Sequence, residues 1–168
     1  MMGQHGVLAH IVAHSLEVAK VALFLAVELN KKGQKIDLGV VEAASLLHDV
    51  TKTEGLKTRE DHAMTGCQLL KGRGYERVGE VVSQHVHLSG EKDPLQVSEE
   101  EVVNYSDKRV RHDHIVSLTD RFVDLKERYG KTPKGLELLD ELEKATFDLE
   151  QKIFSFLEIN PGDLRSLE

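Results

Sequence analysis

The sequence predicts an all-α fold, and three observations support this prediction. Apolar residues recur every three or four positions in several segments, which is the spacing of one face of an α-helix. No segment shows the alternation of apolar and polar residues that is typical of a strand. The chain has 168 residues, of which 40% are hydrophobic and 30% charged, so it is long enough to bury one core. We therefore expect a single domain over 1–168, built as a bundle of six or seven helices.

The first helix is expected over 8–29, because apolar residues there keep the three-four spacing, and it should end near Gly33. Asp37 is a suitable N-cap for a second helix over 38–50. This second segment is apolar or small on nearly every side, which favours a central position. The stretch 51–60 is polar and interrupted by glycine, so we expect a loop there.

Two helices are expected next, at about 60–72 and 75–87, separated by a Gly-Arg-Gly turn. Ser98 is followed by three glutamates, which predicts the capped start of a helix that runs to about Val110. Asp113 is expected to cap the helix that follows.

The segment 130–135 contains two glycines and a proline and should break the chain before a last helix over about 136–158. This last helix either covers the core or pairs with a second copy of the chain, which would make a homodimer.

Composition also limits the class of protein. The chain carries 22 Lys and Arg against 29 Asp and Glu, a formal charge of −7, which argues against direct binding of double-stranded nucleic acid. No uninterrupted apolar run reaches the roughly 18–20 residues of a membrane span, and the first residues do not resemble a secretory signal. The single cysteine, Cys67, cannot form an internal disulfide. We therefore expect a cytoplasmic protein without membrane contact.

Nine histidines are many for this length, and several of them, with two aspartates, fall on apolar helix faces or at helix ends. One inward histidine is more often a hydrogen-bonded core residue than a ligand. A larger group is different, because burying many such side chains without an ion would leave some of them unpaired. Imidazoles and carboxylates are also the ligands of divalent first-row metals. The candidate metal ligands are His14, His48, Asp49, His62, His85 and Asp107.

In this order, the residues resemble the HD-domain metal-dependent phosphohydrolases. The family's H…HD…D pattern is matched by His14, by the pair His48 and Asp49, and by Asp107, within a resemblance that covers about 7–125. The stretch Leu-Leu-His-Asp-Val-Thr-Lys is similar to the family's Leu-Leu-His-Asp-Ile-Gly/Ala-Lys.

Lys52 stands in the place of the motif lysine, whereas Thr51 departs from the small residue that is common there. His62 and His85 are similar to the additional histidines of members that hold two metals. The paired histidines of some dinuclear branches are replaced here by His-Val-His at 85–87, which leaves His85 and His87 as alternative ligands.

The resemblance implies that the protein hydrolyses a nucleotide or a related small phosphate ester with metal-activated water. It implies one or two divalent ions of Fe, Mn, Co, Ni or Zn, with Asp49 as a bridging ligand and Asp49 and Lys52 as catalytic residues. A metal ion lowers the pKa of its bound water from 15.7 towards about 7. Lys52, Lys108, Arg109 and Arg111 adjoin the candidate ligands and are expected to bind the substrate phosphate.

Two other functions are left open by the sequence. The first is a non-catalytic regulatory or ligand-binding module in which the metal site organises the bundle. The second is a di-iron oxygenase of the same fold, because imidazole ligands also suit iron.

Overall fold

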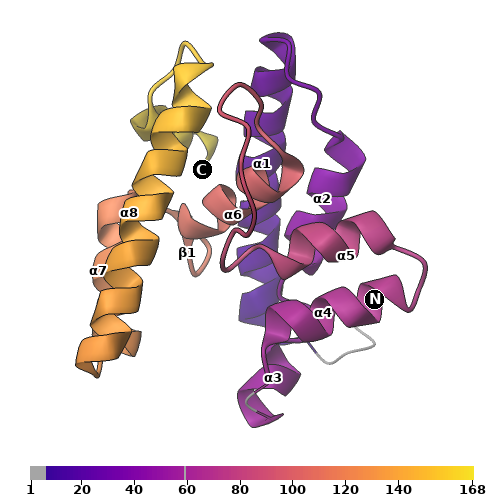
Figure 1. Cartoon of the computed structure of the whole chain (residues 1–168), viewed down its shortest axis with the longest axis vertical. Coiled ribbons are helices and arrows are strands. Elements are labelled where there is room, and N and C mark those ends of the chain that lie inside the picture. Colours follow the sequence, from indigo (N-terminus) through magenta and orange to yellow (C-terminus); the bar gives the residue numbers. More distant parts are fainter. Residues whose placement is uncertain (1–6, 59) are drawn as a thin grey trace.

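The computed structural model describes residues 7–58 and 60–168. The described residues form eight α-helices, one antiparallel pair of short strands and a C-terminal 3-10 helix (Figure 1). The all-α class is therefore confirmed, with more helices than the six or seven expected. In chain order the elements are α1 (Ala9–Lys31), α2 (Leu38–Leu47), α3 (Lys52–Thr58), α4 (His62–Lys71), α5 (Glu76–Ser83), α6 (Glu99–Lys108), β1 (Val110–Arg111), β2 (His114–Ile115), α7 (Leu118–Tyr129), α8 (Pro133–Ser155) and η2 (Pro161–Leu167).

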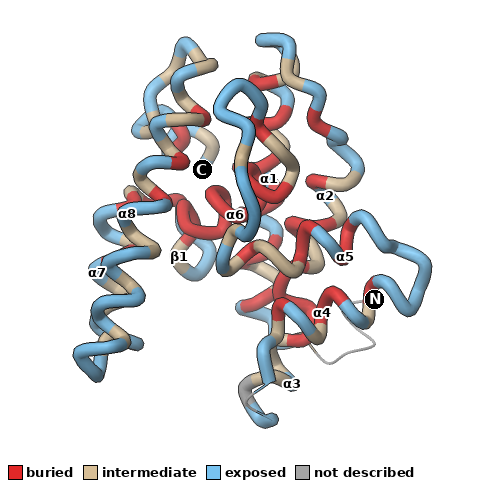
Figure 2. The backbone as a smooth tube through the Cα atoms, viewed as in Figure 1, coloured by how far each residue is buried: buried red, intermediate tan, exposed pale blue. Residues whose placement is uncertain are grey.

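Helices α1 and α6 form the centre of the molecule. Helix α1 packs against α2 and α6, α4 packs with α5 on one side, and α7 packs with α8 on the other (Figure 1). All residues of α6 except Glu99 are buried, and the valines and leucines on the inner face of α1 are fully buried (Figure 2). Burial of this apolar surface is the main favourable contribution to folding.

Helix α1 differs from the expectation that no segment is long and apolar enough to span a membrane. By length and composition alone it could cross a bilayer, although no such segment was expected. Half of its most apolar window is buried inside the molecule, and the helix packs between α2 and α6. Its apolar composition is therefore accounted for by its place in the core.

Two predicted helix starts are present as expected. The Asp37 side chain accepts a hydrogen bond from the backbone N–H of Val40 at 3.0 Å, which caps α2. Ser98 and Glu101 form a reciprocal capping box at the start of α6. Both caps could be predicted from the sequence because each capping side chain bonds to a backbone N–H group only three residues later.

The expected loop over 51–60 is wrong, because most of it forms α3. The carbonyl of Thr51 accepts hydrogen bonds from the backbone N–H groups of Glu54 and Gly55, which starts the helix. A Cβ atom at Gly55 would lie 3.2 Å from Cβ of His62. Gly55 therefore does not interrupt the chain but permits its close return to α4.

The region after α6 also differs from the prediction. The helix ends at Lys108, and Val110 pairs with Ile115 in a short antiparallel hairpin that was not expected. Asp113 lies in the turn of this hairpin and caps no helix. Instead, Ser117 caps α7 by accepting a hydrogen bond from the backbone N–H of Asp120.

The last helix begins earlier than expected. Thr132 caps α8 and Pro133 occupies its first turn. The interruption between α7 and α8 therefore covers only 130–132 and not the expected 130–135. Proline fits this place because the first N–H groups of a helix have no partner within the helix. The helix ends at Ser155, short of the expected 158, and the 3-10 helix η2 that follows was not predicted.

Candidate metal centre

The structure brings all six candidate ligands together from five parts of the chain. They come from the inner face of α1, the turn after α2, the start of α4, the turn after α5 and the last turn of α6. Each of these segments ends or passes close to the same point between α1, α4 and α6. The six residues are, in that order, His14, His48 with Asp49, His62, His85 and Asp107.

One group of ligand atoms lies around His48. Its Nε2 atom is 3.4 Å from Oδ2 of Asp49 and 3.7 Å from Oδ1 of Asp107. The same Asp107 oxygen lies 3.0 Å from Nε2 of His14. The ligand atoms of His14, His48 and Asp49 lie within 4.8 Å of one another, so one metal ion can bind all three.

A second group shares Asp49. Its Oδ1 atom lies 3.3 Å from Nε2 of His62 and 3.6 Å from Nε2 of His85. The two histidine nitrogens are 3.1 Å apart, and all three ligand atoms fall within 4.8 Å of one another. The structure brings His85 into this group, whereas His87 lies outside it on the wall of a cavity. Helix α5 ends at Ser83, so His85 lies in the turn after it and not within the helix expected over about 75–87.

Backbone carbonyls fix the direction of three imidazole rings. A carbonyl oxygen only accepts hydrogen bonds, so each ring nitrogen beside one carries a proton. The Nε2 atom of each neutral ring then has a free lone pair that faces the cluster. The three bonds join Nδ1 of His14 to the carbonyl of His112 at 2.9 Å, Nδ1 of His48 to that of Ser45 at 2.7 Å, and Nδ1 of His85 to that of Val82 at 2.7 Å.

Thr51, which departs from the family pattern, supports the second group. Its hydroxyl donates a hydrogen bond to the carbonyl oxygen of His62 at 2.8 Å and accepts one from the hydroxyl of Thr65 at 3.0 Å. The first residue of α4 is therefore tied to the turn that carries Asp49.

The donor set fits a divalent metal ion. Nε2 of His48 and Oδ1 of Asp49 are buried and have no hydrogen-bond partner among the described residues. Leaving such atoms unpaired costs about 1–3 kcal/mol each, and more for a charged group. Nε2 of His62 also lies 3.1 Å from Nε2 of His85, so both nitrogens are placed to bind one cation. A cation bound between these atoms would satisfy all of them.

The carboxylates of the cluster are ionised in the folded protein. Burial alone would raise the pKa of Asp49, but the attraction of the nearby His48 imidazole in its protonated form holds it well below its usual range. Burial also opposes ionisation of Asp107, and the charge of Lys108 outweighs it and lowers the pKa. The cluster thus presents two negative charges to a cation.

Comparison with known proteins agrees with this geometry. The family model described as the HD domain matches residues 11–125, which is more than half of the chain. The chain belongs to the HD domain family. It is similar to an uncharacterized protein from Methanocaldococcus jannaschii, with 26% identity over 143 residues that cover 76% of this chain and 82% of that protein. No solved structure matches the chain.

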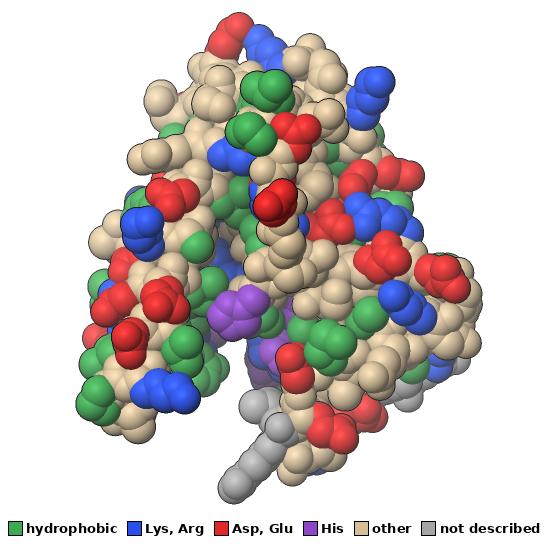
Figure 3. Space-filling view, viewed as in Figure 1, with side chains coloured by type: hydrophobic (Ala, Val, Ile, Leu, Met, Phe, Trp, Pro, Cys, Tyr) green, Lys and Arg blue, Asp and Glu red, His purple; other side chains and the backbone are tan. Residues whose placement is uncertain are grey.

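A cavity of about 750 Å³ opens beside the candidate metal centre of this HD domain. Figure 3 shows histidine side chains at the head of a hollow between the α7–α8 pair and the α3–α4 side of the molecule. Lys52 and Lys108 both line this cavity. Nζ of Lys52 lies 2.6 Å from Oδ2 of Asp49, and Nζ of Lys108 lies 3.0 Å from Oδ2 of Asp107. Of the four cationic residues expected to bind the substrate, Lys52 and Lys108 therefore lie beside the candidate metal ligands.

The expectation that Arg109 binds substrate is wrong. Its side chain is only 2% exposed and points away from the cavity into the core. Nε donates to the carbonyl of Val116 at 2.7 Å, Nη2 donates to the carbonyl of Pro161 at 2.9 Å, and Nη1 lies 3.2 Å from Glu150. Arg111, in the strand β1, is not among the residues that line the cavity either. Arg109 joins α6 to α8 and η2 instead of contacting substrate.

Other cavity residues were not identified from the sequence. Arg121, Leu125, Arg128 and Tyr129 all line the cavity from α7. They stand at positions i, i+4, i+7 and i+8, which is one helical face. The charged residues at this spacing are the signal in the sequence that could have identified this face. The exposed residues His10, His87 and His112 also line the cavity.

Proposed function

We propose that this HD domain is a metal-dependent phosphohydrolase that cleaves a nucleotide or a related small phosphate ester. One arrangement supports the proposal above all others. A buried cluster with unpaired Nε2 and carboxylate atoms lies beside a cavity that contains Lys52, Lys108 and Arg121. A metal centre next to fixed cations is suited to a phosphate group.

The six clustered residues would hold two ions that share Asp49. A divalent ion at this place supplies an acidified water for attack on phosphorus and offsets negative charge on the phosphoryl oxygens. The chain's own contribution is to fix the rings through backbone carbonyls and to keep both carboxylates ionised. The ligands would be His14, His48, Asp49 and Asp107 for one ion, and Asp49, His62 and His85 for the other.

The cationic side chains would hold the phosphate in place. The chain as a whole has a charge of −7, so it does not attract anions by its net charge. Lys52, Lys108, Arg121 and Arg128 nevertheless all line the same cavity. Asp49, Glu60 and Asp107 line the cavity as well, but these four cations favour a phosphorylated substrate over the uncharged substrate that an oxygenase of the same fold could accept.

The test combines metal content with turnover. Purified protein is analysed for metals, and phosphate release is then measured from a panel of nucleotides and phosphate esters with added Mn, Co, Ni or Fe. We expect release that disappears in Asp49→Ala and persists in Asp113→Ala, an exposed aspartate in the hairpin turn. Circular dichroism of both variants checks the fold.

Two results would contradict the proposal. Full metal occupancy without phosphate release from any ester would favour the non-catalytic regulatory module. Consumption of dioxygen without phosphate release would favour the di-iron oxygenase.

A further inference from the structure

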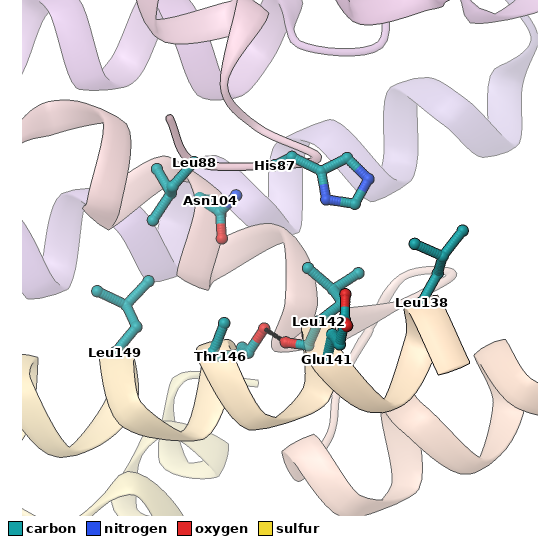
Figure 4. Close-up of a pocket in the computed structure, with 9 residues that line it drawn as sticks. His87, Leu88, Asn104, Leu138, Glu141, Leu142, Thr146 and Leu149 are labelled. Carbon is teal, nitrogen blue, oxygen red and sulfur yellow. Dashed lines mark hydrogen bonds between the residues drawn. The ribbon is translucent and has the colours of Figure 1, made fainter. Parts of the chain in front are cut away.

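A second cavity, of about 260 Å³, adjoins the one at the metal centre. It lies between α6, the segment 87–88 and α8 (Figure 4). His87, Leu138 and Leu142 line both cavities, so the two form neighbouring chambers of one cleft. We call the smaller one the α8 chamber.

The walls of the α8 chamber are mainly apolar. Leu88 faces Leu142 and Leu149 across it, and Ala145 adds a small side chain to the α8 wall (Figure 4). Helix α8 lies beyond the residues 11–125 that the HD family model matches. This wall is therefore supplied by a part of the chain outside the family core.

Partly buried ion pairs hold the wall in place. Nζ of Lys152 lies 2.7 and 2.9 Å from the two carboxylate oxygens of Glu101 on α6. Glu150 on the same helix accepts hydrogen bonds from the Tyr105 hydroxyl and from Arg109. One turn of α8 is thus fixed to α6, directly after the residues of α8 that line the chamber.

Asn104 places one hydrogen-bond acceptor in the chamber. Its Nδ2 atom donates to the carbonyls of Gln84 at 2.9 Å and of His85 at 3.0 Å, which fixes the orientation of the amide. The Oδ1 atom then points towards α8 (Figure 4). No described residue donates a hydrogen bond to it, so this oxygen is available to a ligand that carries an N–H group.

The acceptor lies close to the metal centre. The carbonyl oxygen of His85 accepts hydrogen bonds both from Asn104 at 3.0 Å and from Nζ of Lys108 at 2.6 Å. Asn104 also stands one helical turn before Asp107 on α6. A small molecule can therefore reach both the metal centre and the α8 chamber.

We propose that the α8 chamber binds the organic group of the substrate, and that this group is a flat ring bearing an amino group, as in adenine or cytosine. The proposal rests on the proposed function for the phosphate end of the substrate. The apolar walls remove the ring from water, and Oδ1 of Asn104 accepts a hydrogen bond from the amino group. A site that accepts a hydrogen bond from the substrate discriminates strongly against analogues that lack the donor.

The first test measures nucleoside binding without any phosphate. Adenosine, cytidine and purine riboside, which lacks the amino group, are titrated into the wild-type protein by calorimetry. The same titrations use Ala145→Trp, which fills the chamber from an exposed position, and Gln151→Trp, an exposed position of α8 that lines neither cavity. Circular dichroism confirms that both variants are folded.

We expect adenosine or cytidine to bind the wild type and Gln151→Trp, and to bind Ala145→Trp at least about tenfold more weakly. Purine riboside should bind the wild type at least about tenfold more weakly than adenosine. The proposal is overturned if neither amino nucleoside binds the wild type, if Ala145→Trp binds as the wild type does, or if purine riboside binds as well as adenosine.

The second test separates this inference from the proposed function. Ala145→Trp should raise the KM for adenosine monophosphate at least about tenfold, whereas Gln151→Trp, outside both cavities, should leave this KM unchanged. If the wild type releases phosphate and Ala145→Trp has the same KM as the wild type, only the α8 chamber proposal fails. If no ester is cleaved, the proposed function fails, and the nucleoside titrations still decide the chamber proposal.

Discussion

Oδ1 of Asp49 lies 3.3 Å from Nε2 of His62, although helix α3 separates the two residues in the chain. The other oxygen of Asp49 lies 3.4 Å from Nε2 of His48. One carboxylate therefore faces two groups of imidazoles, as a bridging ligand between two ions would. The tight return at Gly55 and the Thr51 hydroxyl bring this arrangement about.

His62→Ala should remove one ion while leaving the other in place. His62 belongs only to the second ligand group, so the group around His48 keeps its donors. After dialysis, we expect metal content by mass spectrometry to fall by about one ion per chain. The control is His87→Ala, which lines the cavity outside the cluster and should leave metal content unchanged. Wild-type metal content in His62→Ala would argue against a second site.

Lys52→Met should weaken phosphate binding without loss of metal. The ammonium group lines the cavity and lies 2.6 Å from Oδ2 of Asp49. Hydrogen bonds to charged groups contribute about 1.5–3 kcal/mol, so kcat/KM should fall by about 10–100-fold. Metal content is measured in parallel. If the metal is lost together with the activity, the lysine supports the ligands and not the substrate.

Arg121→Gln should lower kcat/KM by a similar factor, about 10–100-fold. Its Nε atom is buried without a hydrogen-bond partner among the described residues, and the side chain lines the cavity. Arg111→Gln is the matched control, because it removes the same charge outside the cavity. Equal losses in the two variants would show that overall charge, and not a contact with phosphate, is responsible.

Arg77→Gln should reduce stability at neutral pH more than at acid pH. Burial alone would raise the pKa of Glu100, but the hydrogen bond from Arg77 lowers it below its ordinary value of 4.5. A lowered carboxyl pKa stabilises the folded state above the ordinary pKa, and this contribution is lost as the pH falls through the lowered value. Arg77 is partly exposed, so the expected loss at pH 7 is on the order of 1 kcal/mol.

Urea unfolding at pH 7 and at pH 3 measures this difference. Lys35→Gln, which removes the same charge from an exposed position, is the control. A destabilisation of Arg77→Gln that is the same at both pH values would show that the pair with Glu100 does not contribute through ionisation.

The sequence was most informative where a structure depends on neighbouring residues. The caps at Asp37 and Ser98 bond within three positions, and the apolar spacing placed His14 and Asp107 on the inner faces of their helices. The pair His48 and Asp49 was recognised because the residues around it resemble a known motif. These features together predicted the fold class and the family.

Contacts between distant segments could not be predicted in this way. Arg109 follows two candidate site residues in the chain, but its partners Glu150 and Pro161 lie 41 and 52 positions away and draw it into the core. Helix α3 depends on the close approach of Gly55 to His62, which glycine content alone does not reveal. The α8 chamber likewise depends on the packing of α8 against α6.

Anomalous diffraction from a crystal grown with saturating Zn²⁺ tests the central claim most directly. The account predicts an anomalous peak at about 2.0–2.2 Å from Nε2 of His48 and from a carboxylate oxygen of Asp49. A second peak is expected between Asp49, His62 and His85. The absence of any anomalous peak within this cluster, with zinc bound elsewhere or not at all, would contradict the account.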